Sequence, residues 1–398
     1  MRQYFLLLFF LCFSSYLQAA ESVALTQQYS DSSKCKSCHH QIIDQWKHSW
    51  HAKSHYKNDE YFRKTVDYVG RKSRKSANAI KIECAGCHNP RISVTKTGMD
   101  YELQVAMKLD KNSKVNKALA SDTLSEGINC VVCHNIDKIH TDLDDSKRGV
   151  NRVSWMPQGT MVGPFENAFS PYHKTEQRDF FNDKADTLCF VCHANDRSVA
   201  GLEFTNMQKE YKKSKKMCVD CHMSPRIDGI ASTLRIKDGK QVKRKVRKHG
   251  FRGAHTKSMW EGALDLKAEA KDGKLIITLK NSNPHNIPSG FGSRELIIDV
   301  EFKSVGEVVK RQSMSLTRHY TSKRDKPTIP HLAVKQSADV SIPANGSKSV
   351  SFPLQEAADS ATINLSYRLV NDEVRNLLKL KEAIWSEKMP INILKMKF

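Results

Sequence analysis

Cys35-Lys36-Ser37-Cys38-His39 is the first of five pentapeptides of the same kind in this chain. The other four are Cys84-Ala85-Gly86-Cys87-His88, Cys130-Val131-Val132-Cys133-His134, Cys189-Phe190-Val191-Cys192-His193 and Cys218-Val219-Asp220-Cys221-His222. Cys-x-x-Cys-His is the attachment signature of c-type haem. Two thiols on one helical turn can form thioethers to the two vinyl groups of a porphyrin, and the histidine then faces the iron as its proximal ligand. The sequence therefore predicts five covalently attached haems.

The cysteine count leaves little room for another use of these thiols. The chain has 11 cysteines, of which ten lie in the pentapeptides and the last is Cys12 in an apolar N-terminal segment. No pair remains for a structural disulfide. Paired Cys-x-x-Cys units also build zinc ribbons, but a zinc ribbon gives no reason for a histidine after every second cysteine. We therefore favour haem over zinc.

Residues 1–20 have the pattern of an export signal. Arg2 supplies a positive charge, residues 5–13 are apolar, and residues 14–20 are polar or small, so we expect cleavage near Ala20. No stretch of the sequence approaches the roughly 18 apolar residues of a membrane-spanning helix. The mature protein is therefore predicted in the periplasm, where c-type haem is attached, with the outer cell surface as a further location.

The chain is strongly basic, with a formal net charge of +21. The propionates of five haems would lower this value to roughly +10 to +15. Lysines are dense at residues 212–216 and 237–248. They form either a solvated surface or a docking face for an acidic redox partner or an anionic substrate. We expect no nucleic-acid binding, because the chain is predicted to be exported and has no aromatic-basic reading motif. The sequence does not indicate an oligomeric state.

The chain divides by composition near residue 259. Residues 21–258 hold every haem motif and are too polar for a large aliphatic core, so we expect short helices and loops around the porphyrins. After residue 259 the pattern changes to alternating strands, which predict an antiparallel β-sandwich over residues 259–371. The expected strands are 264–270, 275–281, 295–303, 307–317, 339–343, 347–354 and 361–370. Residues 372–398 are predicted to form a C-terminal helix over 373–388 and an extended tail.

A second pattern follows the first haem motif. Trp46, Ser49 and His51 fit Trp-x-x-Ser-x-His. In this respect the sequence resembles the cytochrome c-554/c-prime type of multihaem cytochrome. The resemblance implies that His51 is the distal ligand of a haem other than the one bound by Cys35 and Cys38.

Further short matches resemble related multihaem cytochromes. They are Glu126-Gly127-Ile128, Gly163-Pro164-Phe165, Ser170-Pro171-Tyr172-His173, the run from His249 to His255, and Pro284-His285-Asn286-Ile287-Pro288-Ser289-Gly290, where Ser289 replaces the usual threonine. The resemblance implies distal ligands at His173, His249, His255 and His285. That family type has four haems and this chain five, so His40, His55 and His140 are kept as substitutes. His319 and His331 are interpreted as ordinary histidines of the β-domain.

The axial ligands of the haem irons decide between two functions. Iron with histidine on both faces transfers electrons, whereas an open sixth position allows chemistry. The 16 histidines leave 11 for at most five distal positions, so the count alone reveals no vacancy. We favour a periplasmic cytochrome that carries electrons along five haems between redox partners. The alternative is a multihaem oxidoreductase of nitrite, hydroxylamine or a sulfur oxyanion at a high-spin haem. In either case the β-domain could serve as a docking module.

Overall fold

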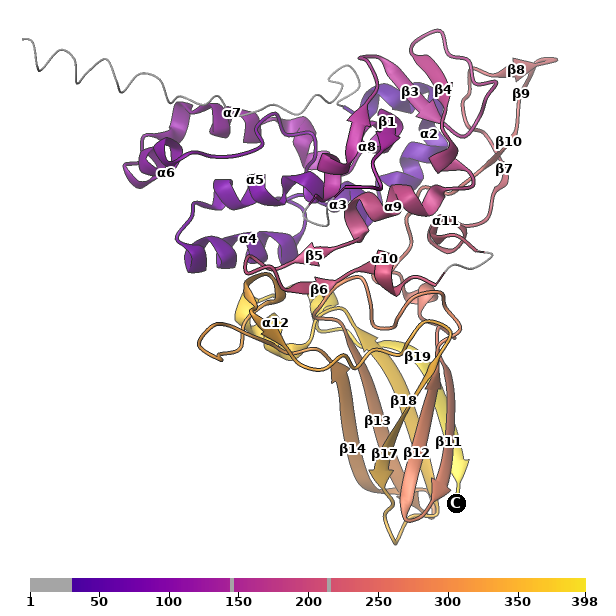
Figure 1. Cartoon of the computed structure of the whole chain (residues 1–398). Coiled ribbons are helices and arrows are strands. Elements are labelled where there is room, and N and C mark those ends of the chain that lie inside the picture. Colours follow the sequence, from indigo (N-terminus) through magenta and orange to yellow (C-terminus); the bar gives the residue numbers. More distant parts are fainter. Residues whose placement is uncertain (1–30, 144–146, 213–215) are drawn as a thin grey trace, which may run out of the picture.

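The computed structural model describes residues 31–143, 147–212 and 216–398 (Figure 1). The expected export signal at residues 1–20 lies outside these ranges. A region of short helices and two-stranded ribbons lies at one end of the molecule, and a β-sandwich of two sheets lies at the other. The predicted fold class is confirmed: a helical and irregular region precedes an antiparallel β-sandwich with a short C-terminal helix.

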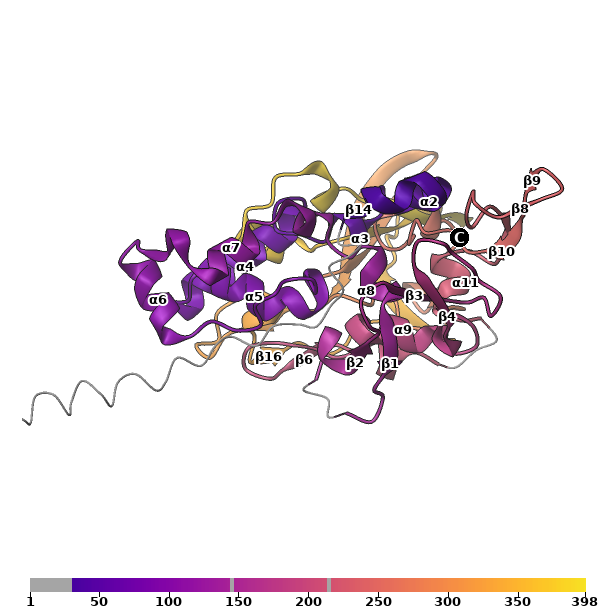
Figure 2. The same ribbon diagram turned by 90° about the horizontal axis from the view of Figure 1, so that it is seen from above.

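The N-terminal part of the described chain is mainly helical and extends to one side of the molecule (Figure 2). Its α-helices are α2 (Ser33–Trp46), α3 (Trp50–Lys53), α4 (Glu60–Ser73), α5 (Ala77–His88), α6 (Met99–Ala106), α7 (Lys114–Leu119) and α8 (Cys130–His134). Helix α4 begins after Asp59, whose carboxylate accepts the backbone N–H of Phe62 at 3.0 Å. This cap satisfies one of the free N–H groups at the helix start. None of the described helices is long and apolar enough to cross a bilayer.

Short helices and ribbons follow as far as residue 259. The helices are α9 (Ala185–His193), α10 (Met207–Glu210) and α11 (Cys218–His222). The paired strands are β1 (Ile136–Ile139) with β2 (Val153–Trp155), β3 (Thr160–Gly163) with β4 (Lys174–Gln177), β5 (Asp196–Arg197) with β6 (Glu203–Thr205), β7 (Ile227–Gly229) with β10 (Arg244–Val246), and β8 (Ile236–Lys237) with β9 (Lys240–Gln241). Only small apolar clusters form here, such as Ile136, Val162 and Phe180. This region therefore has little aliphatic core of its own.

Each Cys-x-x-Cys-His motif lies on a helix. Helices α5, α8, α9 and α11 all end at the histidine of their motif, and α2 is kinked at His39, where φ is −116° and ψ is 32°. The two cysteines of a motif therefore share one turn, and the histidine lies at the end of the helix or, in α2, at its kink.

The sandwich is built from two antiparallel sheets. One has the order β14 (Glu307–Thr317), β13 (Glu295–Ser304), β18 (Ser360–Arg368) and β19 (Met389–Lys397), and the other has β11 (Asp265–Lys271), β12 (Lys274–Lys280) and β17 (Ser347–Pro353). Strands β11 and β12 are joined by Asp272 and Gly273, both at positive φ. This geometry is that of the tight Asp-Gly hairpin turn expected from the sequence. Leu275, Ile277 and Leu279 alternate along β12 and are fully buried.

Three predicted elements of the sandwich region differ from the structure. Residues 339–343 form no named strand, and Ile342 makes only an isolated bridge to Ile287. The predicted helix over 373–388 is α12 (Asp372–Leu378), which ends because Lys379 adopts the left-handed conformation. The chain then passes through η7 (Ala383–Trp385). The expected tail is strand β19, because its alternating apolar side chains let it pair with β18 and bury Ile391.

Packing is continuous between the helical region and the sandwich. Phe62, Val66 and Val69 of α4 belong to the same apolar cluster as the buried residues of β12, β13 and β18. The buried Glu60 carboxylate accepts the backbone N–H groups of Lys381 and Glu382 at 3.0 and 2.9 Å. Residue 259 therefore marks a change of secondary structure without a break in the core.

Candidate haem-binding sites

The ten motif cysteines are free, partly accessible thiols. Burial raises the pKa of Cys84 and of Cys133 to about 12, so both remain protonated at neutral pH. No sulfur of the five motifs is occupied by a disulfide. All ten are therefore available for thioether bonds.

Cysteines of different motifs lie next to one another. A cysteine of another motif raises the pKa of Cys35, Cys192, Cys218 and Cys133; the neighbours are Cys130, Cys87, Cys189 and Cys189, respectively. The attachment sites therefore follow one another in the order first, third, fourth and fifth motif, and the second motif branches off at the fourth.

The proximal histidines are oriented by their second ring nitrogen. The Nδ1 of His39 lies 2.5 Å from the carbonyl oxygen of Ala231, that of His134 lies 2.6 Å from Val162, and that of His222 lies 2.5 Å from Arg252. A backbone carbonyl can only accept, so Nδ1 carries the proton and donates it. The Nε2 lone pair then remains free for a metal, an arrangement that metal-binding histidines commonly use.

Four proximal histidines face a second histidine. The ring-centroid separations are 6.5 Å for His39 and His173, 6.2 Å for His193 and His51, 6.3 Å for His134 and His249, and 6.4 Å for His222 and His285. Two metal–nitrogen bonds of about 2 Å and two half-rings of about 1 Å span roughly 6 Å. Each pair therefore leaves room for one metal ion between its rings.

Three of the facing histidines also have Nδ1 bound to a backbone carbonyl. The acceptors are Lys174 for His173 at 3.2 Å, Arg247 for His249 at 3.0 Å, and Asn286 for His285 at 2.9 Å. With the proton on Nδ1, the ring lone pair lies on Nε2, as in the predicted proximal rings.

The histidine rings of these pairs are poorly hydrated but keep some accessible surface. Loss of hydration lowers the pKa of His193 to about 4, although its side chain is exposed. The same loss of hydration lowers the pKa of His51 to about 3 and that of His249 to about 4, and both keep some accessible surface. The residues therefore fit a large planar cofactor enclosed between facing histidines.

His88 of the second motif has different surroundings. Its Nδ1 lies 3.3 Å from the Ser54 hydroxyl, and its ring stacks on Phe62 with centroids 4.2 Å apart and planes within 4°. Within the described ranges no histidine ring faces His88 at the separation seen in the other four pairs. Among the described residues, the predicted proximal histidine of the second motif therefore has no second histidine ring opposite it.

The remaining predicted ligands are placed elsewhere. His255 stacks on Trp50 with centroids 3.7 Å apart and does not face a proximal histidine. The Nδ1 of His55 accepts the backbone N–H of Lys57 at 3.1 Å, so the neutral ring carries its proton on Nε2 and has no lone pair there for a metal. The Nε2 of His140 lies 2.7 Å from the Ser154 hydroxyl. His40 lies on α2 and makes no ring contact with a proximal histidine among the described pairs.

Sequence analysis missed one histidine of interest. His331, interpreted as ordinary, lies deep in the protein between Phe204 and Phe291, close enough to His88 for their charges to repel. No local pattern in the sequence marks it, because the fold of the sandwich brings it there. His319, the other histidine given the same interpretation, is exposed, and its Nδ1 lies 3.3 Å from Glu373.

Close backbone contact explains the glycine in the short match Glu126-Gly127-Ile128. Gly127 has a φ of +61°, and a Cβ at this position would come within 2.6 Å of the carbonyl oxygen of His51. The next residue, Ile128, donates its N–H to that oxygen at 2.9 Å. The segment before the third motif thus holds helix α3, which carries His51.

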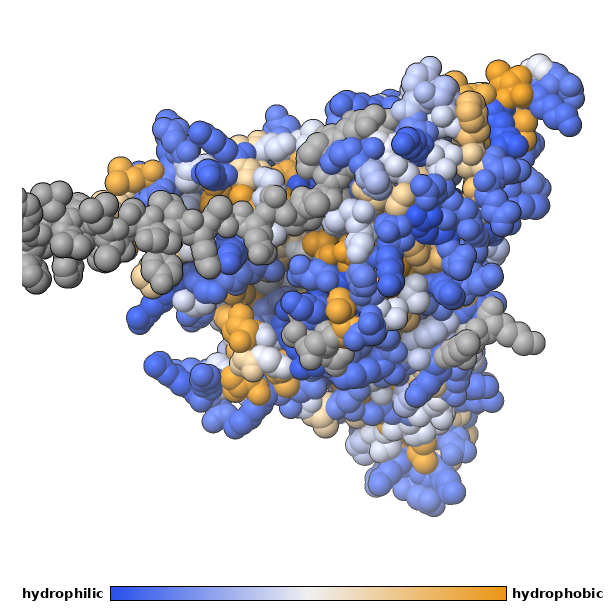
Figure 3. Space-filling model, turned by 45° about the horizontal axis from the view of Figure 1, so that its top comes forward, coloured by the Kyte–Doolittle hydropathy of each residue, from blue (hydrophilic) through white to orange (hydrophobic). Residues whose placement is uncertain are grey.

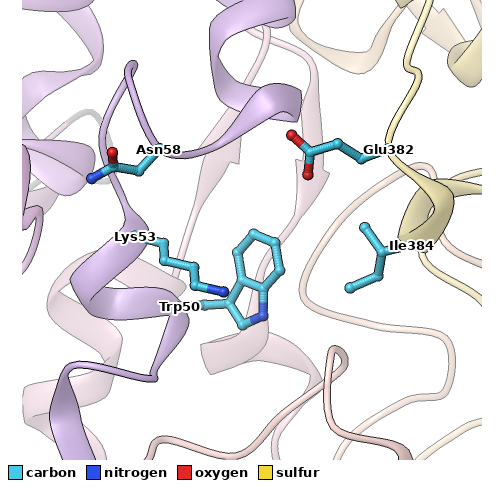
Figure 4. A pocket seen from close by; sticks show the side chains of 5 residues that line it. All are labelled: Trp50, Lys53, Asn58, Glu382 and Ile384. Carbon is cyan, nitrogen blue, oxygen red and sulfur yellow. The ribbon is translucent and has the colours of Figure 1, made fainter.

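A cavity of about 490 Å³ opens between α3 and the segment before η7 (Figure 4). It is lined by Trp50, Lys53, Asn58, Glu382 and Ile384. Lysine and glutamate both line it, so it selects neither anions nor cations by charge. No proximal histidine lines it.

Comparisons with known proteins agree with this geometry. Residues 34–135 match the family model described as "Cytochrome c554 and c-prime". The fold is similar to that of a penta-heme cytochrome c552 from Thermochromatium tepidum, with a TM-score of 0.68 and 18% identical residues, over 92% of this chain and 98% of that chain. No curated protein sequence matches.

Proposed function

We propose that this chain, a multihaem c-type cytochrome with a cytochrome c554 and c-prime domain, carries electrons between redox partners in the periplasm. The observation that carries the proposal is the set of four histidine pairs with ring centroids 6.2 to 6.5 Å apart. Haem held between two histidines supplies reversible one-electron chemistry. The protein supplies the thioether sulfurs, the paired ligands and a space closed to bulk water.

The arrangement of the motifs supports transfer over several sites. Contacts between cysteines of the first and third motifs, and of the fourth and fifth, bring attachment sites side by side. We expect neighbouring cofactors at these contacts. The first motif lies towards one end of this series and the fifth lies at the other, so donor and acceptor can use separate surfaces.

A basic surface covers the end that holds the first motif. His39 donates to the Ala231 carbonyl, and Thr233 donates its backbone N–H to Cys38. The chain then forms the exposed hairpin β8–β9, which carries Lys237 and Lys240. The surface around the hairpin is hydrophilic at its tip and has an apolar patch beside it (Figure 3), where Leu234 and Ile236 are exposed. We therefore place the docking site for an acidic redox partner, the basic hairpin surface, at residues 235–248.

Charge reversal tests the basic hairpin surface. The triple variant K237E/K240E/K243E should slow electron transfer to a small acidic redox protein and weaken the dependence of the rate on salt, because steering charges are lost. Stopped-flow absorbance measures both quantities. The matched control K267E/K274E/K395E changes the same number of exposed lysines on the sandwich. Equal slowing by both triple variants would contradict docking at the hairpin.

A second function is supported by the surroundings of His88. This position lacks a facing histidine among the described residues, so the metal bound there would have an open face. An open face admits a small molecule, as in the alternative oxidoreductase function. Electrons could then reach it through the contact between Cys87 and Cys192.

Ferric electron paramagnetic resonance of the holoprotein tests both functions. We expect four low-spin signals and one high-spin signal, from the second motif. Five low-spin signals would exclude the open position, and electron transfer would then be the one remaining function. A turnover assay with reduced viologen and nitrite or hydroxylamine then tests whether the open position is catalytic.

A further inference from the structure

His331 has only part of its hydrogen-bonding capacity satisfied. It lies in η6 (Pro330–Leu332), within the sandwich region. Its Nδ1 is buried and has no hydrogen-bond partner in the described part of the chain. The residue nevertheless keeps accessible surface. Nε2, at the other edge of the ring, is not among the buried side-chain atoms that lack a partner in the described part of the chain.

Aromatic contacts hold the ring next to the second motif. The centroid of His331 lies 5.1 Å from that of Phe204 and 6.1 Å from that of Phe291. Phe291 packs edge-on against Tyr61 at 5.0 Å, and the next residue, Phe62, stacks on His88. The His331 carbonyl accepts the N–H of Val199 at 2.8 Å, which fixes the backbone. His331 and His88 therefore contact members of one run of neighbouring aromatic rings, and they lie close enough for their charges to repel.

The missing partner at Nδ1 determines the tautomer. A neutral imidazole carries one proton, on either nitrogen. A buried N–H without an acceptor is costly, so the proton of His331 favours Nε2. The facing histidines His173, His249 and His285 have the opposite arrangement, with Nδ1–H bound to a carbonyl. His331 therefore offers a donor where those three offer a lone pair.

We propose that His331 donates a hydrogen bond from Nε2–H to a small anion bound at the open position opposite His88, and is not itself a metal ligand there. This rests on the open position proposed above. These surroundings suit a small ligand, because the rings of Phe204 and Phe291 lie next to that of His331 and limit the room beside it. An anion accepts such a bond more strongly than a neutral molecule does.

Azide binding to the ferric holoprotein tests the proposal. The variants are His331→Phe, which keeps a ring and removes the donor, and His331→Gln, which keeps an amide donor. We expect His331→Phe to weaken azide binding about 10- to 100-fold, the usual effect of losing a hydrogen bond to a charged group. His331→Gln should bind azide nearly as well as the wild type. Optical titration gives each affinity.

Controls keep the outcomes distinct. Low-spin signals from the other four positions report that each variant is folded and loaded, and His319→Phe serves as a matched substitution of an exposed histidine. Unchanged azide affinity in His331→Phe would overturn the role of His331 alone. A wild type with five low-spin signals and no azide binding would overturn the open position as well. If His331→Phe gains a high-spin signal that the wild type lacks, His331 is a metal ligand and the proposal is wrong.

Discussion

At the scale of single residues, the contact made by Nδ1 separates the histidines of this protein into groups. His39, His134 and His222 donate from Nδ1 to a carbonyl, and so do three of the four histidines that face a proximal ring. His51 is the exception, since its Nδ1 has no carbonyl partner within residues 31–143, 147–212 and 216–398, although its ring faces His193 at 6.2 Å. Backbone carbonyls thus prepare most rings to bind a metal through Nε2.

His285 and His255 provide a direct test of this grouping. His285 faces His222 at 6.4 Å, whereas His255 stacks on Trp50. His285→Ala should convert one low-spin haem to high-spin, because the open face no longer has a ligand. His255→Ala should leave the spin states unchanged and lower only the stability, since it loses a stacking contact. Ferric electron paramagnetic resonance of both variants decides, and a new high-spin signal in His255→Ala would restore that residue as a ligand.

The site could be predicted from sequence only where the signal is local. The five pentapeptides fix ten cysteines and five histidines by spacing alone. His173 and His249 lie in short matches, and the structure brings each opposite a proximal ring. His255 lies in the same run as His249, but the chain turns it towards Trp50. His331 has no local signal at all, because its position depends on the packing of the sandwich.

At the scale of elements, the alternation of apolar and polar residues predicted most of the strands. It missed the elements whose structure depends on residues far away in the sequence. The pattern of β12 and the Asp272-Gly273 turn are local, and both were predicted. Strand β19 was predicted as a tail, because its structure depends on pairing with β18, some thirty residues away. The helix over 373–388 was overestimated, since the burial of Leu380 and Trp385 in the core, not helix propensity, directs the chain after Leu378.

The buried carboxylate of Asp59, at the start of helix α4, lowers the stability of the folded protein in a pH-dependent way. Burial raises the pKa of Asp59 from 3.8 to about 6, with a further contribution from Glu382, and Arg63 and the capping N–H groups oppose it. The folded pKa exceeds the unfolded one, so stability falls as pH rises from about 4 to about 6. The cost above pH 6 is at most about 3 kcal/mol, at about 1.4 kcal/mol per pKa unit.

Asp59→Asn tests this cost. An asparagine still accepts the N–H of Phe62 as a cap but has no charge to bury. The variant should be more stable than the wild type above pH 6, and its stability should change less between pH 4 and pH 6. Urea unfolding followed by circular dichroism across this range measures the effect. Parallel pH profiles for variant and wild type would show that Asp59 is not the titrating group.

At the scale of the whole molecule, the two regions share a core. Helix α4 contributes Phe62, Val66 and Val69 to the cluster of the sandwich, and Glu60 binds the N–H groups of Lys381 and Glu382. The sandwich in turn supplies His285 opposite His222. The β-domain is therefore part of the structure around the motifs. If the β-domain also docks a partner, that function is additional to its structural role around the motifs.

Shared packing predicts one cooperative unfolding transition for both regions. Val66 is fully buried on α4, and Val66→Ala removes two methyl groups from the shared cluster, at a cost of about 1 to 3 kcal/mol. The Soret band reports the region of the motifs, and circular dichroism near 215 nm weights the sandwich. In the wild type both signals should melt together, and Val66→Ala should lower both midpoints equally. Val115→Ala is the control, because Val115 is buried in a separate cluster with Ile92 and Tyr101. If Val66→Ala shifted only the Soret transition, the sandwich would be an independent domain and the shared core would carry no coupling.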